Sequence, residues 1–162
     1  MKKQIAYLGI ILTVLSGCNS QNVLKLNDTI VKANSDLKEA SDSFNKKFES
    51  VSNNNYSVLE EDRKKMSSEI DQKRKEIASL KADMPGGEDF RNAFVDYYKF
   101  EKDIYDTDYK DICKLSNGSD AEKLVQIANQ MKQKTTKEEA MEKNIHTEQE
   151  KFATKNNLKL KY

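Results

Sequence analysis

The sequence is poor both in residues that interrupt helices and in residues that perform chemistry. Its 162 residues include one proline, five glycines, two cysteines, one histidine and no tryptophan. So little proline and glycine in a chain rich in Lys, Glu, Asp and Asn is typical of helical proteins. The single histidine, and the lack of a Gly-rich phosphate loop, a Ser/His/Asp set or a Cys/His pair, argue against catalysis. We therefore expect an all-α protein that is not an enzyme and has no catalytic residues.

The first eighteen residues have the organisation of a targeting segment. Lys2 and Lys3 precede an apolar run from Ile5 to Leu15, and small residues follow. A positive start, a short apolar core and small residues are the three parts of a secretory signal peptide. The run is too short for a membrane-spanning helix, which needs about 20 residues. The pattern predicts a signal peptide over 1–17.

The segment Leu15-Ser16-Gly17-Cys18 resembles the lipobox of bacterial lipoproteins. The resemblance implies that Cys18 is the lipidation site and the first residue of the mature protein. Residues 18–22 would then be the lipidated cysteine and a short tether. The chain would be held at a membrane of the bacterial cell envelope, on its periplasmic or surface side. The alternative is an N-terminal anchor helix with an incidental cysteine.

The charge of the chain gives little attraction to polyanions. The formal net charge is +1, and removal of Lys2 and Lys3 with the signal peptide changes it to −1. A nearly neutral protein is not drawn electrostatically to nucleic acid or to an anionic membrane surface. We expect no nucleic-acid partner, and we expect membrane contact to come from the lipid on Cys18.

The second cysteine, Cys113, lies in a helical stretch beside Ile112 and Leu115. If Cys18 is acylated, Cys113 has no partner within the chain. We interpret Cys113 as a small residue buried in helix packing. An intermolecular disulfide and a reactive thiol are the alternatives.

Apolar residues recur every three or four positions over 23–155, which predicts four amphipathic helices. Asn53-Asn54-Asn55, Pro85-Gly86-Gly87 and Asn117-Gly118 separate them, and Ser57 with Glu60 is a candidate capping box. Short turns between long helices favour an up-down-up-down antiparallel four-helix bundle. A seven-residue apolar repeat in the last helix predicts a left-handed supercoil. The polar residues 156–162 are expected to form a flexible tail. We expect boundaries near 53–57, 84–88 and 116–120, with Phe44, Ile70, Phe94 and Leu124 buried.

Charged residues on the helix seams suggest polar layers. Glu101 and Asp108 fall at the centre of the third helix's apolar arc. Counting from Pro85 brings Lys73 level with Glu101, and Arg63 level with Asp108 or Asp111. We therefore predict a Lys73–Glu101 pair between the second and third helices, and we expect these pairs to fix helix register.

The same carboxylates do not form a recognisable metal motif. A di-iron bundle needs Glu-x-x-His pairs, and the chain's only histidine, His146, is not part of one. Lys110 follows Asp106 and Asp108 where a calcium loop needs a third ligand. We therefore expect no metal or cofactor, and we interpret Asp103, Asp106, Asp108 and Asp111 as a solvated acidic face.

The helical, Lys- and Asn-rich body behind the lipobox also resembles small helical-bundle lipoproteins of bacterial surfaces and periplasms. The segment 86–98 (GGEDFRNAFVDYY) resembles a signature of such families. The resemblance implies neither an activity nor catalytic residues. We expect a non-enzymatic interaction protein that binds another envelope protein or itself. The alternative is a small-ligand carrier, which would have an interior cavity near Thr135 and Glu138.

Overall fold

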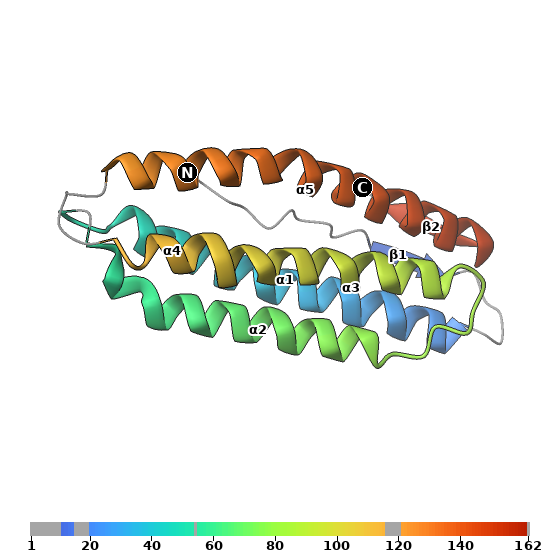
Figure 1. Ribbon diagram of the computed structural model, residues 1–162. Helices are drawn as coiled ribbons and strands as arrows, with labels where there is room; N and C mark the ends of the chain where they lie inside the picture. The colour runs from blue at the N-terminus through green and yellow to red at the C-terminus, as the bar shows by residue number, and fades with distance from the viewer. Residues whose placement is uncertain (1–10, 15–19, 54, 116–120, 162) are drawn as a thin grey trace.

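The protein is a four-helix bundle. The computed structural model describes residues 11–14, 20–53, 55–115 and 121–161 (Figure 1). Short helical turns follow two of the long helices: 3₁₀ helix η1, π-helix η2 and the single turn α4. The long helices are α1 (Ser20–Glu49), α2 (Glu60–Ala78), α3 (Gly87–Ile104) and α5 (Ala121–Lys155); the short turns are η1 (Tyr56–Leu59), η2 (Tyr105–Tyr109) and α4 (Lys110–Ile112).

Successive long helices run in opposite directions, which confirms the predicted antiparallel, all-α four-helix bundle (Figure 1). The most extensive backbone contacts join α2 to α3, α3 to α5 and α1 to α2. α1 and α5 approach one another much less closely. α3 is therefore the central helix of the packing. The left-handed supercoil stays a prediction.

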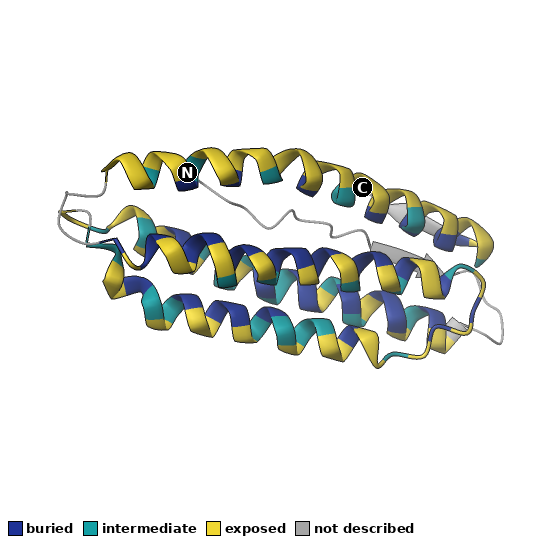
Figure 2. Cartoon of the chain, viewed as in Figure 1, coloured by how far each residue is buried: buried dark blue, intermediate teal, exposed yellow. Residues whose placement is uncertain are grey.

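The apolar stripes predicted from the sequence face inward. Buried positions line the sides of α1, α2 and α3 that face one another, while much of α5 is exposed (Figure 2). Phe44, Ile70 and Phe94 are buried as predicted. The prediction for Leu124 was wrong, because its side chain is only partly covered in the first turns of α5.

The predicted boundaries hold at two turns, with local differences. α1 ends at Glu49 and α3 begins at Gly87, next to Gly86, whose φ of 74° favours glycine. α2 ends earlier than predicted, at Ala78, and the loop to Gly86 follows. The boundary at 116–120 lies outside the described residues.

The capping box predicted at Ser57 does not form. The chain makes the 3₁₀ turn η1 before α2, so Ser57 precedes the α-helix by too many residues to cap it. Its hydroxyl donates instead to Asn55 Oδ1, at 2.6 Å.

A two-stranded ribbon closes one end of the bundle. β1 (Ile11–Val14) pairs antiparallel with β2 (Leu158–Lys161), and Leu158 is buried. The flexible tail predicted over 156–162 is therefore replaced by a strand. Asn157, with a φ of 54°, makes the turn from α5, and Asn156 Nδ2 donates to the Pro85 carbonyl at 2.8 Å.

The N-terminal predictions are only partly covered by the described residues. β1 falls inside the predicted signal peptide 1–17. α1 begins at Ser20, so three residues of the predicted 18–22 tether are helical. Cys18 itself lies outside the described residues.

Within the described residues, none of the helices combines the length and apolar character that crossing a membrane requires.

Candidate functional site

A π-helical turn interrupts the α-helix at the end of α3. η2 (Tyr105–Tyr109) has the wider i→i+5 spacing before α4 resumes. A π-turn inserts one residue into the α-helical phase, and such turns are common at functional sites. Asp106 of this turn contacts Arg63 of α2 and Asp108 contacts Lys134 of α5, so two carboxylates two residues apart lie at different helix interfaces.

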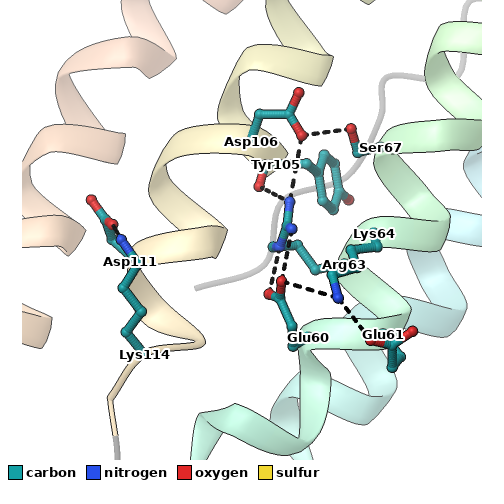
Figure 3. Close-up of polar contacts among 9 residues, drawn as sticks. All are labelled: Glu60, Glu61, Arg63, Lys64, Ser67, Tyr105, Asp106, Asp111 and Lys114. Atoms are coloured by element: carbon teal, nitrogen blue, oxygen red, sulfur yellow. Dashed lines mark hydrogen bonds and ion pairs between the residues drawn. The ribbon is translucent and has the colours of Figure 1, made fainter.

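Arg63 of α2 is the centre of the polar contacts between α2 and η2 (Figure 3). Its Nε and Nη2 donate to the two Glu60 oxygens at 2.7 and 3.0 Å. Its Nη1 donates to the Tyr105 carbonyl at 3.1 Å and lies 3.4 Å from Asp106 Oδ1. Ser67 Oγ donates to the same Asp106 oxygen at 2.6 Å. The Arg63 side chain thereby connects α2 to the π-turn, through the backbone carbonyl of Tyr105 and the side chain of Asp106.

The charges of this network reinforce one another. Arg63 is buried, with 7% of its side chain exposed. Its hydrogen bond to Glu60 raises the pKa of Arg63 and lowers the pKa of the Glu60 carboxyl. Burial raises the pKa of Asp106, but hydrogen bonds from Lys102 and Ser67 outweigh it and leave that pKa below its usual value. At neutral pH these groups are charged, so the network stabilises the contact between α2 and η2.

The predicted partners of the seam charges were wrong in both cases. Arg63 contacts Asp106, near the start of the π-turn, in place of Asp108 or Asp111. Lys73 Nζ pairs with Asp36 Oδ2 of α1, at 2.7 Å, and not with Glu101. Counting residues from the turn ignored a third helix that also presents a carboxylate to Lys73.

The aspartates interpreted as a solvated acidic face are in fact paired with lysines. Lys134 of α5 lies 2.7 Å from Asp108 and 3.2 Å from Asp103, which joins α5 to the π-turn. Lys102 pairs with Asp106 in the same helical stretch. Lys114 lies 2.6 Å from Asp111. Asp108 is also buried, so the face is a set of ion pairs and only partly solvated.

A row of buried tyrosines lies on the other side of α3 and η2. Tyr98 donates to Asn34 Oδ1 of α1 at 3.3 Å, and Tyr105 is hydrogen-bonded to Ser41. The rings of Tyr105 and Tyr109 stack with centroids 4.9 Å apart. These contacts form a polar seam between α1 and α3 inside an otherwise apolar core.

Two buried carboxylates act on this tyrosine row. Burial is the main cause that raises the pKa values of Tyr98, Tyr105 and Tyr109, and the charge of Glu101 raises all three further. Glu138 of α5 adds to the shift at Tyr105 and Tyr109. Glu101 is 0% exposed and Glu138 9%. The interior therefore places two buried carboxyl groups beside neutral phenols.

The polar residues that α1 contributes to this seam were not predicted from the sequence. Asn27, Asn34 and Ser41 are all buried and lie seven residues apart. They adjoin the apolar stripe of α1, and their seven-residue spacing was the available signal. Polar residues that repeat with the apolar period of a bundle helix mark a second inward face.

The remaining candidate residues lie either in the core or on the exposed surface of the bundle. Cys113 is buried and free, and burial raises the pKa of its thiol to about 11, which agrees with the packing interpretation. His146 and Thr135 are exposed, and Thr135 donates to the Met131 carbonyl at 3.4 Å. Among the described side chains, none of the His, Cys, Asp and Glu residues gather into a group of three that could hold a metal ion.

The end of the bundle where α1 runs into η1 has an open surface pocket. Its volume is ≈ 410 Å³, and residues at the end of α1, in the following loop and in η1 line it. Val58 is 62% exposed beside it, and Lys47 forms an ion pair with Asp62 at its rim. In the same part of the chain, Phe48 packs against Tyr56 with ring centroids 5.3 Å apart. The pocket is open and is lined by apolar, polar and charged residues.

Comparison of the chain with protein-family models, with curated proteins and with solved structures finds no significant match.

Proposed function

We propose that the chain is a lipid-anchored, non-enzymatic protein of the bacterial cell envelope that binds another envelope protein or a second copy of itself. Cys18 carries the lipid, and residues 1–17 are removed as a signal peptide. The proposal depends mainly on the order of features at the N-terminus. Lys2 and Lys3, an apolar run, the lipobox and Cys18 are followed almost at once by the start of α1 at Ser20.

The position of α1 determines how such a protein would stand on its membrane. α1 begins two residues after Cys18, so the end of the bundle that holds Ser20 would lie near the lipid. At about 1.5 Å per residue, the 30 residues of α1 carry the chain about 45 Å away. The pocket beside Val58 would then face away from the membrane, where a partner can reach it.

The placement of the reactive side chains supports a binding role over a catalytic one. Cys113 lies in the core with a raised pKa, which disfavours the nucleophilic thiolate. Asp103, Asp106 and Asp108 each have a lysine partner. These groups stabilise the bundle. We therefore infer that the protein acts through contacts made by its surface.

Membrane fractionation tests the anchor. Cys18→Ala should release the protein from membranes or leave an uncleaved precursor, because acyl chains supply the anchoring energy at about 0.8 kcal/mol per buried CH₂. Cys113→Ala is the matched control and should be processed and retained like the unaltered protein. A Cys18→Ala protein that is still cleaved and membrane-bound would contradict the proposal.

Site-directed photo-crosslinking in native membranes tests the partner. A crosslinking residue at position 58 should capture another envelope protein or a second copy of the chain. The same residue at Lys99, exposed on the side of α3, is the control and should capture much less. Equal capture at both positions would argue against the pocket as the contact.

The buried polar seam favours a second candidate function, a small-ligand carrier. Glu101 and Glu138 are buried beside the tyrosine row, and these polar side chains inside the bundle are the observation that favours a polar ligand. Native mass spectrometry of protein purified from its own membranes should then show a bound small molecule that Glu101→Gln loses. A protein mass without any such ligand would count against the carrier.

A further inference from the structure

The β1–β2 ribbon brings together segments from opposite ends of the sequence. β1 pairs antiparallel with β2, with Thr13 opposite Lys159. β1 packs against α1 and β2 packs against α5 (Figure 1). The ribbon thus bridges the two long helices whose own backbones hardly meet.

Processing at Cys18 would take this bridge apart, a consequence that rests on the proposed function. Removal of residues 1–17 removes all of β1. β2 then loses the strand with which it pairs among the described residues, and α1 loses the segment that covers it at this end. A strand edge left in this state presents N–H and C=O groups that readily pair with another strand.

The same end of the bundle holds two buried acceptors. Asn27 in the first turns of α1 and Gln149 in the last turns of α5 are each 1% exposed. Asn27 Oδ1 and Gln149 Oε1 accept no hydrogen bond among the described residues. Buried carbonyl oxygens normally have a donor. Within the described part of the chain both oxygens are unpaired with β1 in place, so the chain's own strand leaves this end of the bundle incompletely satisfied.

We propose that, in the processed protein, the free edge of β2 and the adjoining surface of α1 form a docking site for an extended apolar segment of a partner envelope protein. Strand addition of this kind derives affinity from backbone hydrogen bonds and specificity from alternate side chains. β1 itself shows the chemistry that fits. Its register places Val14 opposite Leu158 and Leu12 opposite Leu160, so apolar positions of one strand lie opposite apolar positions of the other.

A second copy of the chain fits this edge less well. The strand it would offer is its own β2, with the alternating sequence Leu-Lys-Leu-Lys. Antiparallel pairing of two such strands sets lysine opposite lysine or lysine opposite leucine, whichever register is chosen. Like charges directly opposite are destabilising, and the mixed pairs lose the apolar match. The site therefore favours an uncharged strand over self-pairing.

Peptide binding to the processed lipoprotein, purified in detergent, tests the site. The probe is a fluorescent peptide of residues 10–15 with added terminal lysines for solubility. The control peptide carries Leu12→Pro and Thr13→Pro, and because N–H groups alternate along a strand, it loses at least one ladder donor. Anisotropy titration should show at least about tenfold weaker binding of the control peptide.

The unprocessed chain carrying Cys18→Ala is the matched protein control, because its own β1 fills the site. It should bind the probe at least about tenfold more weakly than the processed protein. Hydrogen exchange should show the amides of 158–161 protected in the unprocessed chain, unprotected after processing, and protected again when the probe binds.

Three results overturn the site while leaving the lipid anchor standing: no binding by the processed protein, equal binding of both peptides, or a processed protein that dimerises through β2. A native protein that keeps residues 1–17 overturns the anchor itself, and the docking site with it. Intact mass separates that outcome from the other three.

Discussion

α3 and α5 differ in how much of each helix is buried in the bundle. α3 buries nine of its 18 residues, whereas α5 buries seven of its 35. The buried residues of α3 are mostly aromatic or aliphatic, but two of those on α5 are Glu138 and Gln149. α3 is held on several sides by α1, α2 and α5, while α5 packs chiefly on α3 and β2. The stability of the fold therefore centres on α3, and α5 contributes less buried surface to it.

The largest expected effect is the loss of a ring from α3. Phe94 is 0% exposed, so Phe94→Ala should lower the free energy of unfolding by roughly 3–5 kcal/mol. Met131 on α5 is 8% exposed at the edge of the packing, and Met131→Ala should cost about 2 kcal/mol. Urea denaturation followed by circular dichroism measures both. Equal losses would remove the distinction between the two helices.

The ion pairs should follow the same order. Arg63→Ala leaves the α2–η2 network without its centre and should cost about 2–3 kcal/mol, since hydrogen bonds to charged groups are the stronger kind. Lys134→Ala removes the partly exposed lysine that bridges α5 to the buried Asp108 and should cost about 1 kcal/mol. A double-mutant cycle of Arg63 with Asp106 should show coupling. If Lys134→Ala is the more damaging change, α5 is held more firmly than we infer.

The smallest effect is expected at the Lys73–Asp36 pair between α1 and α2. Its hydrogen bond from Lys73 lowers the pKa of Asp36 below 3.8, and the pKa of Lys73 is raised above 10.5. The pair is partly solvated, so Asp36→Asn should cost less than about 1 kcal/mol at pH 7.

The pH dependence of that loss follows from the two shifts. A lowered carboxyl pKa gives stability that is present above pH 3.8 and disappears as pH falls through the folded-state pKa. The lysine contribution is present below pH 10.5 and disappears as pH rises through its folded-state pKa. Stability curves of Asp36→Asn and the unaltered protein should therefore converge at both extremes. A difference that does not shrink as pH falls below 3.8 would contradict this account of the pair.

Local apolar patterns were enough to predict the four helices and most of their buried faces. Phe44, Ile70 and Phe94 follow from spacing alone, because a helix has one face to bury and the spacing identifies it. Leu124 was misjudged because α5 is covered on one side only in its first turns. The ribbon could not be predicted, since pairing of Ile11–Val14 with Leu158–Lys161 joins segments far apart in the sequence.

The contacts of the charged residues were the least predictable part of the site. The π-turn at Tyr105–Tyr109 has no signal in the apolar spacing, yet it contains Asp106, the aspartate that Arg63 contacts. Lys73 has acceptors on more than one helix, and long lysine side chains reach any of them at similar cost. The polar stripe through Asn34 and Ser41 did have a signal in the sequence, its seven-residue repeat. A search for apolar residues alone does not detect that repeat.

Intact mass spectrometry of the protein extracted from its native membranes tests the central claim, the lipid anchor at Cys18, most directly. We predict a chain that begins at Cys18 and carries the added mass of acyl chains, with the modification localised to that residue by fragmentation. A chain that begins at another residue, or an unmodified Cys18, would contradict the account.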